Sequence, residues 1–148
     1  AEFQNVKRRM EVSGVVLRPD GPITVYDDFA HHPTAIRTTL EGLRAKVGSG
    51  RIVVAMEPRS NSMRLGSHAA EIAPSLNAAD AVVFLHRPEL SWDAGKAITA
   101  LKGHGQTAMT VDGLIAELKA LVREGDHVVF MSNGGFEGAP RRFLAALS

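Results

Sequence analysis

Short apolar runs that alternate with segments of helical spacing restrict the fold of this chain more than any other feature. Residues 51–56, 81–85 and 127–131 are almost continuously apolar. Strands of this kind belong to parallel sheets whose two faces are both covered by helices. A further strand is predicted at 107–111, and the helical segments are predicted at 33–46, 68–79, 93–101, 112–123 and 139–147. The alternation predicts an α/β domain with right-handed crossovers.

The start of the chain has a different pattern. Residues 12–18 and 23–28 are rich in strand-forming side chains, and the turn signal Asp20-Gly21-Pro22 lies between them. These two segments are expected to pair as an antiparallel hairpin. The predicted fold is therefore a Rossmann-like three-layer sandwich with a mostly parallel sheet of about six strands and an N-terminal antiparallel hairpin.

Local signals set the predicted limits of the helices. Pro33 suits the first turn of the first helix, and Gly48 suits its end. Pro74 is expected to disturb the second helix, because proline cannot donate a backbone hydrogen bond. Asp93 and Asp112 are expected to cap the two helices that they begin.

Composition argues against several classes of function. The 148 residues carry a net charge of +1 and no cysteine. So small a charge gives no reason to expect nucleic acid as a partner, and without cysteine there are no disulfides and no thiolate metal sites. No apolar run approaches the roughly 18 residues that span a membrane, and the first residues do not resemble a signal peptide. These features fit the cytoplasm and predict no membrane partner.

Three polar clusters follow predicted strands at their carboxyl ends. Residues 27–33 read Asp-Asp-Phe-Ala-His-His-Pro, residues 57–63 read Glu-Pro-Arg-Ser-Asn-Ser-Met, and residues 132–138 read Ser-Asn-Gly-Gly-Phe-Glu-Gly. Ligands of open parallel sheets bind beyond the carboxyl ends of the strands. We therefore expect the three clusters to converge on one rim of the sheet, and this convergence indicates a ligand site more strongly than any single motif.

The first cluster suits phosphate, metal or proton chemistry. Asp28 can hold a magnesium-bound water or an ammonium group, whereas His31 and His32 can donate to phosphate or take up a proton near neutral pH. The helix that begins at Pro33 adds a positive dipole end. A helix cap with exposed neighbours is the simpler interpretation of the same residues. No protein metal site is predicted, because two Asp and two His so close together lack the usual zinc spacing.

The second and third clusters suit anions. Arg59 can pair with a carboxylate or phosphate through two parallel hydrogen bonds, and Ser60 and Asn61 add short polar arms. Gly134 and Gly135 let backbone N–H groups approach a ligand closely. An ordinary polar loop and a tight turn would use the same residues. The chain contains neither a Gly-x-Ser-x-Gly elbow nor a Gly-x-x-x-x-Gly-Lys-Ser/Thr phosphate loop.

These motifs resemble those of the Mur ligases, which act on UDP-N-acetylmuramate. Residues 27–34 match their Asp-Asp-Tyr/Phe-x-His-His-Pro-Thr signature, and residues 3–11 look like the segment that leads into their C-terminal domain. Residues 57–63 and 131–136 are similar to those of the family members that add the recycled tripeptide L-alanyl-γ-D-glutamyl-meso-diaminopimelate. The resemblance covers nearly the whole chain. It implies that residues 1–10 lead in from a preceding ATPase domain and that residues 11–148 form the C-terminal domain.

The resemblance implies an ATP-dependent amide ligase of three domains. ATP would phosphorylate the muramoyl carboxylate, and the amine of the incoming peptide would then displace phosphate. UDP-N-acetylmuramate and the tripeptide would be the substrates, and ATP with Mg²⁺ would be bound mainly by the preceding domain. This piece alone, without a phosphate loop, is expected to be inactive. No oligomeric state is predicted.

The resemblance also implies roles for single residues. Asp28, His31 and His32 would be catalytic, and Asp27 and Arg8 would join Asp28 and His31 on the nucleotide side. The groups expected to hold the carboxylates of the peptide are Arg59, Ser60, Asn61, Ser132, Asn133, Gly134 and Gly135. Two alternatives remain: the corresponding domain of the family member that adds L-alanine, and a stand-alone anion-binding module.

Overall fold

The computed structural model describes residues 10–30, 33–57, 69–85, 101–132 and 136–147. Six strands in these ranges form one sheet in the order β1-β2-β6-β3-β4-β5. β1 pairs antiparallel with β2, and every other neighbouring pair is parallel. The strands are β1 (Glu11–Val16), β2 (Ile23–Asp28), β3 (Ile52–Met56), β4 (Ala81–Leu85), β5 (His104–Ala108) and β6 (His127–Met131). The predicted fold class and the predicted hairpin are confirmed.

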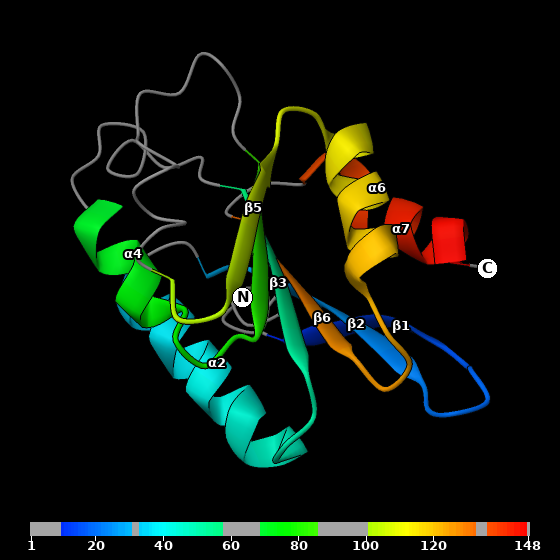
Figure 1. Cartoon of the computed structure of the whole chain (residues 1–148), viewed down its shortest axis with the longest axis horizontal. Coiled ribbons are helices and arrows are strands. Elements are labelled where there is room, and N and C mark those ends of the chain that lie inside the picture. Colours follow the sequence, from blue (N-terminus) through cyan, green and yellow to red (C-terminus); the bar gives the residue numbers. More distant parts are fainter. Residues whose placement is uncertain (1–9, 31–32, 58–68, 86–100, 133–135, 148) are drawn as a thin grey trace, which may run out of the picture.

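Helices cover both faces of the sheet (Figure 1). α2 (Pro33–Val47) and α4 (Ala69–Ser75) lie on one face, and α6 (Val111–Leu121) and α7 (Ala139–Leu147) lie on the other. A short 3-10 turn, η1 (Phe136–Gly138), precedes α7. These layers form the predicted three-layer sandwich.

Two hydrophobic cores, one under each pair of helices, explain why the central strands are apolar without interruption. In β3, Val54 and Met56 belong to the core beneath α2, whereas Val53 and Ala55 belong to the core beneath α6 and α7. Successive side chains of a strand point to opposite faces of the sheet. Every position of β3 is therefore buried, and every position carries an apolar side chain.

β6 is the last strand in the sequence, yet it lies between β2 and β3. Its parallel register places Met131 beside Asp28 of β2 and beside Met56 of β3. The three strands therefore end at the same level of the sheet. The polar residues that follow them start from neighbouring positions, although they are far apart in the sequence.

The signals predicted for α2 operate as expected. The helix begins at Pro33 and buries the apolar stripe of Ile36, Leu40 and Leu43. Gly48 follows the last helical residue with a φ of 63°, and its N–H donates to the carbonyl of Arg44 at 2.9 Å. Glycine adopts this left-handed conformation without a Cβ penalty, so it ends the helix at little cost.

The position predicted for β5 is wrong by three residues. The strand occupies His104–Ala108 and not residues 107–111. β5 is the edge of the sheet, pairs only with β4 and is largely exposed. An edge strand of this kind needs no apolar run, so the apolar pattern indicated the wrong segment.

The N-cap predicted for the following helix is also wrong. α6 is capped by Thr110, whose side chain accepts a hydrogen bond from the backbone N–H of Gly113 at 3.0 Å. Asp112 lies inside the first turn instead, where its charge is favourable beside the positive end of the helix dipole. Val111, which was predicted to end the preceding strand, is instead the first residue of α6, and its side chain is buried.

α4 is shorter than predicted. It ends at Ser75, directly after Pro74, whereas the sequence predicted a helix as far as residue 79. Beyond Pro74 the chain continues in tight turns, in which the N–H of Asn77 donates to the carbonyl of Pro74 at 3.2 Å. The helix predicted at 93–101, with its expected cap at Asp93, falls almost entirely outside the described residues.

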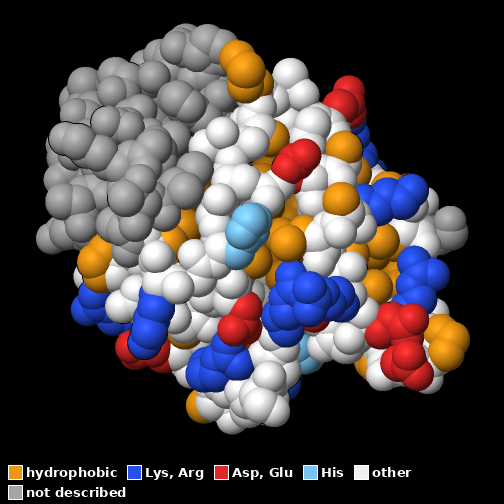
Figure 2. Space-filling model, viewed as in Figure 1, with side chains coloured by type: hydrophobic (Ala, Val, Ile, Leu, Met, Phe, Trp, Pro, Cys, Tyr) orange, Lys and Arg blue, Asp and Glu red, His pale blue; other side chains and the backbone are white. Residues whose placement is uncertain are grey.

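In the described part of the chain, no helix has both the length and the apolar character needed to cross a membrane. Figure 2 shows that basic and acidic side chains stand close together at several places on one face of the molecule. A surface hollow near the C-terminus of α6 is lined by basic and acidic side chains together: Arg18, Lys119, Arg123, Asp20 and Glu124.

Gly103 provides a test of the turn that leads into β5. A Cβ atom at this position would lie 2.5 Å from the carbonyl oxygen of Asp80 and 2.9 Å from that of Ala79. Both are backbone atoms, so Gly103→Ala should lower the free energy of unfolding by about 1–3 kcal/mol. Urea unfolding of the 148-residue chain measures this change.

Gly42 is the matched control. It is an exposed residue of α2 that lines a cavity along this helix, and a Cβ atom there would meet no described side chain or neighbouring element within 4 Å. Gly42→Ala should therefore raise the free energy of unfolding by up to about 1 kcal/mol through helix propensity. Equal stability of the two variants would contradict the packing described at Gly103.

Candidate functional site

Three buried polar side chains lie where β2, β6 and β3 end. Asp28 is the last residue of β2, Ser132 directly follows β6, and Glu57 directly follows β3. All three are almost completely buried, with exposed fractions of 0%, 0% and 1%. The structure thus brings one residue from each of the three predicted clusters to the same rim of the sheet, and for these residues the expected convergence is confirmed.

Backbone hydrogen bonds fix these residues relative to one another. The N–H of Ser132 donates to the carbonyl of Asp28 at 3.2 Å, and the N–H of Glu57 donates to the carbonyl of Met131 at 2.9 Å. The ladder between the strands therefore continues past their ends. The positions from which the three polar segments leave the sheet are set by the sheet itself.

Ser132 and Glu57 also join through their side chains. The hydroxyl of Ser132 donates to Oε1 of Glu57 at 2.6 Å, in a buried setting. Met131 and Met56 belong to the core beneath α2, so the residues after them are expected to point toward α6 and α7. This hydrogen bond links the ends of β6 and β3 on that side of the sheet.

Asp28 points to the opposite face and organises the start of the first cluster. Its Oδ1 accepts the N–H of Ala30 at 2.7 Å, and its Oδ2 accepts the N–H of Met10 at 2.8 Å. The bond to Ala30 forms a turn from an aspartate to the residue two positions later. The carboxylate thus anchors both the turn after β2 and the segment that enters β1.

The two adjacent aspartates, predicted together on the nucleotide side, separate in the structure. Asp28 lines a cavity of about 320 Å³ between β2 and α2. Asp27 lines a different cavity, of about 370 Å³, with Pro140, Arg141 and Leu144 of α7. Alternation of side chains along β2 places them on opposite faces, so one ligand cannot contact both carboxylates from a single face of the sheet.

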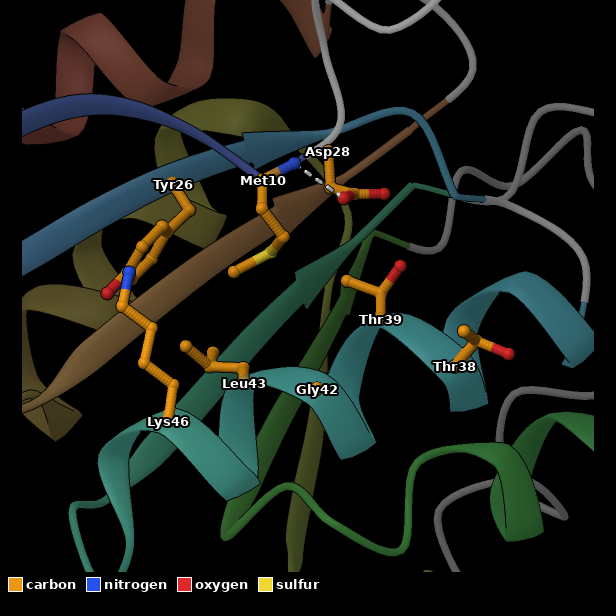
Figure 3. Close-up of a pocket in the computed structure, with 8 residues that line it drawn as sticks. All are labelled: Met10, Tyr26, Asp28, Thr38, Thr39, Gly42, Leu43 and Lys46. Carbon is orange, nitrogen blue, oxygen red and sulfur yellow. Dashed lines mark hydrogen bonds between the residues drawn. The ribbon is translucent and has the colours of Figure 1, made fainter.

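The cavity at Asp28 runs along α2 (Figure 3). Met10, Tyr26 and Leu43 supply its apolar surface, while Thr38 and Thr39 of α2 and Lys46 near the helix end supply polar groups. Figure 3 shows the carboxylate of Asp28 at one end of this group and Lys46 near Tyr26 at the other. A cavity of this size and lining accommodates a small molecule with polar ends and an apolar middle.

Tyr26 connects this cavity to the amino end of β6. Its hydroxyl is hydrogen-bonded to Nδ1 of His127 at 2.9 Å. Burial raises the pKa of Tyr26. Burial also lowers the pKa of His127, and the Lys46 and Arg44 charges lower it further, against the opposing effect of Asp126. Both side chains are therefore neutral near pH 7.

The elements that follow β2, β3 and β6 do not all cover the same face of the sheet. The helices that follow β2 and β3 cover one face of the sheet, whereas η1 and α7, which follow β6, cover the other (Figure 1). Among the described elements, those that follow β2 and those that follow its neighbour β6 therefore lie on opposite faces. Such a reversal is where open α/β sheets bind their ligands, and Asp28, Ser132 and Glu57 lie at it.

Most of the predicted site residues fall outside the described part of the chain. Asp27, Asp28 and Ser132 are described, and their positions are given above. The others lie outside the described residues, and their roles stay predictions: Arg8, His31, His32, Arg59, Ser60, Asn61, Asn133, Gly134 and Gly135.

The structure adds Glu57 to the site, although it was not among the predicted site residues. Its position directly after a continuous apolar strand was the available signal, because a carboxylate there must enter the rim of the sheet. Among the described residues, no group of three or more His, Cys, Asp or Glu side chains is arranged to hold a metal ion.

Comparison with known proteins identifies the family. Residues 8–134 match the family described as "Mur ligase, glutamate ligase domain", and the chain belongs to this family. The UDP-N-acetylmuramate–L-alanyl-gamma-D-glutamyl-meso-2,6-diaminoheptandioate ligase of Haemophilus influenzae is 44% identical over 146 residues, which are 98% of this chain and 31% of that protein. The chain thus spans about a third of the length of the curated relatives it matches.

A solved structure of a family member has the same fold. The murein peptide ligase of Psychrobacter arcticus is 41% identical to this chain and superposes with a TM-score of 0.81, covering 95% of this chain and 30% of that protein. The UDP-N-acetylmuramate–L-alanine ligase of a Nocardioides species is less similar, at 34% identity over an alignment of 156 positions that covers 99% of this chain and 34% of that protein. The chain is more similar to the tripeptide-adding relatives than to this alanine-adding one.

The two hydrogen bonds of Asp28 give a prediction about stability. Asp28→Ala leaves the N–H groups of Met10 and Ala30 without their acceptor, which should lower the free energy of unfolding by about 1–3 kcal/mol. Hydrogen exchange should accelerate at the amide of Ala30, and amide exchange with urea unfolding measures both effects.

Asp28→Asn is the matched control, because its side-chain carbonyl can still accept one of the two N–H groups. The free energy of unfolding of Asp28→Asn and its exchange rate at the Ala30 amide should both lie between the values of the wild-type chain and of Asp28→Ala. Unchanged exchange at Ala30 in Asp28→Ala would contradict the anchoring role of the carboxylate.

Proposed function

We propose that this chain is the C-terminal, peptide-presenting domain of an ATP-dependent ligase that joins UDP-N-acetylmuramate to L-alanyl-γ-D-glutamyl-meso-diaminopimelate. The observation that carries the proposal is the 44% identity, over 98% of the chain, to a ligase named for this reaction. The identity is 34% to an alanine-adding relative, so the tripeptide is the better-supported substrate. Such a ligase would act in the bacterial cytoplasm during recycling of cell-wall peptides.

The reaction proceeds through an acyl phosphate. The muramoyl carboxylate attacks the terminal phosphorus of ATP, and ADP leaves. The amine of the tripeptide then attacks the acyl carbon, so that a C–N bond forms, the C–O bond to phosphate breaks and the amine gives up a proton. Mg²⁺ would offset the phosphate charges. ATP and Mg²⁺ would be held mainly by a preceding domain, because the chain has no phosphate loop.

The rim at the ends of β2, β6 and β3 supports the presenting role. Asp28 anchors the turn that leads to His31 and His32, which would face the nucleotide and the reacting phosphate with Arg8. Because Asp28 is buried and holds two backbone N–H groups, its contribution is to place that turn. Arg59, Ser60 and Asn61 would bind the carboxylates of the peptide, together with Asn133 and the two glycines after it.

The substrate is tested with the full-length parent protein. It should form ADP with UDP-N-acetylmuramate and the tripeptide far faster than with free L-alanine. The isolated 148-residue chain is the control and should show no ATP turnover. A parent enzyme that prefers L-alanine would establish the alanine-adding alternative, and one that ligates neither amine would leave the stand-alone anion-binding module.

Arg59 is tested by its effect on two Michaelis constants of the parent enzyme. Arg59→Ala should raise the KM for the tripeptide about tenfold or more, because a charge-assisted carboxylate contact contributes about 1.5–3 kcal/mol. The KM for ATP should stay within about twofold of wild type. Steady-state kinetics with each substrate varied in turn measures both constants.

Arg123→Ala is the matched control. Arg123 is exposed and precedes β6, at the opposite end of the strands from the rim, so neither KM should change. An unchanged tripeptide KM in Arg59→Ala would refute the role given to Arg59.

A further inference from the structure

Glu57 carries a buried carboxylate that the proposed reaction does not use directly. The residue is 1% exposed, and the hydroxyl of Ser132 donates to its Oε1 at 2.6 Å. Removing a carboxylate from water is costly unless the protein supplies hydrogen bonds. An apolar side chain would fill the same space without this cost, so we expect a role that requires the Glu57 carboxylate itself.

The Glu57–Ser132 pair joins two strands at the point where both end. The N–H of Glu57 bonds to the carbonyl of Met131, the residue before Ser132, and the N–H of Ser132 bonds to the carbonyl of Asp28. The side-chain bond adds a second link between β3 and β6, one residue beyond their last paired positions. The ends of these two strands cannot separate or rotate without breaking it.

We propose that Glu57 is a positioning residue for the peptide substrate and that it acts through Ser132. The inference rests on the proposed function, because Arg59, Ser60 and Asn61 directly follow Pro58 after Glu57, and Asn133 directly follows Ser132. The bond fixes the spacing between the two points from which these peptide-binding groups leave the sheet. The hydroxyl of Ser132, which was expected to bind the peptide, donates its hydrogen bond to Glu57.

Stability and positioning can be separated by experiment. Replacing both partners of a buried polar pair by apolar groups is often nearly neutral for stability, whereas removing one partner is not. A double variant, Glu57→Leu with Ser132→Ala, should therefore keep much of the thermal stability and lose the link. Glu57→Gln keeps an oxygen that can accept the bond from Ser132.

The experiment measures steady-state kinetics and thermal unfolding of the full-length ligase. The double variant should show a tripeptide KM raised at least about tenfold, with the KM values for ATP and UDP-N-acetylmuramate within about twofold of wild type. Glu57→Gln should keep the tripeptide KM within about threefold. Ser132→Ala alone should raise it at least about fivefold, which provides a second measurement if the double variant fails to fold.

Ser75→Ala is the matched control for loss of a buried serine hydrogen bond. Ser75 is also buried, and its hydroxyl donates to the carbonyl of Ile72 at 2.6 Å, within α4. This variant should lose stability without a change in the tripeptide KM.

Two outcomes separate the inference from the function on which it rests. A wild-type parent that does not ligate the tripeptide overturns the proposed function and the inference with it. A wild-type parent that does ligate it, with Ser132→Ala no different from Ser75→Ala in its tripeptide KM, overturns the positioning role alone.

Discussion

The insertion of β6 between β2 and β3 is the constraint on which the rest of the structure depends. β6 pairs in parallel with both neighbours, so that Asp28, Met131 and Met56 lie side by side across the three strands. Because β6 comes late in the sequence, the centre of the sheet is complete only when distant parts of the chain have met. This contact brings the polar ends of three strands together, and it places the helices that follow them on opposite faces.

Side-chain alternation then distributes the polar groups between the two faces. Asp28 enters the cavity beside α2, whereas Asp27 faces the cavity beside α7. Ser132 and Glu57 bond to each other at the end of β6 and β3. Asp27 and Asp28 are adjacent in the sequence, but their side chains line cavities on opposite faces of the sheet. The buried carboxylates of Asp28 and Glu57 accept hydrogen bonds from two backbone N–H groups and from the hydroxyl of Ser132.

The sequence predicted the elements whose signals are local and strong. The central strands are apolar because both faces are covered, and α2 lies between a proline and a glycine that set its ends. The sequence misplaced β5 by three residues, since an exposed edge strand needs no apolar pattern. It also missed the Thr110 cap, since threonine competes with aspartate as a cap. The convergence of the three clusters was predicted from the rule for parallel sheets, and it is confirmed for Asp28, Glu57 and Ser132.

By itself, the sequence determined the fold class, the family resemblance and the strand ends at which a site must lie. Those conclusions follow from periodicity and from short motifs, which are properties of neighbouring residues. Only the tertiary structure decided which cavity each of the two aspartates lines and that the hydroxyl of Ser132 bonds to Glu57. Both depend on strand order, register and burial, which arise from contacts between distant residues. The Ser132–Glu57 bond, for example, joins residues 75 positions apart, so no single segment encodes it.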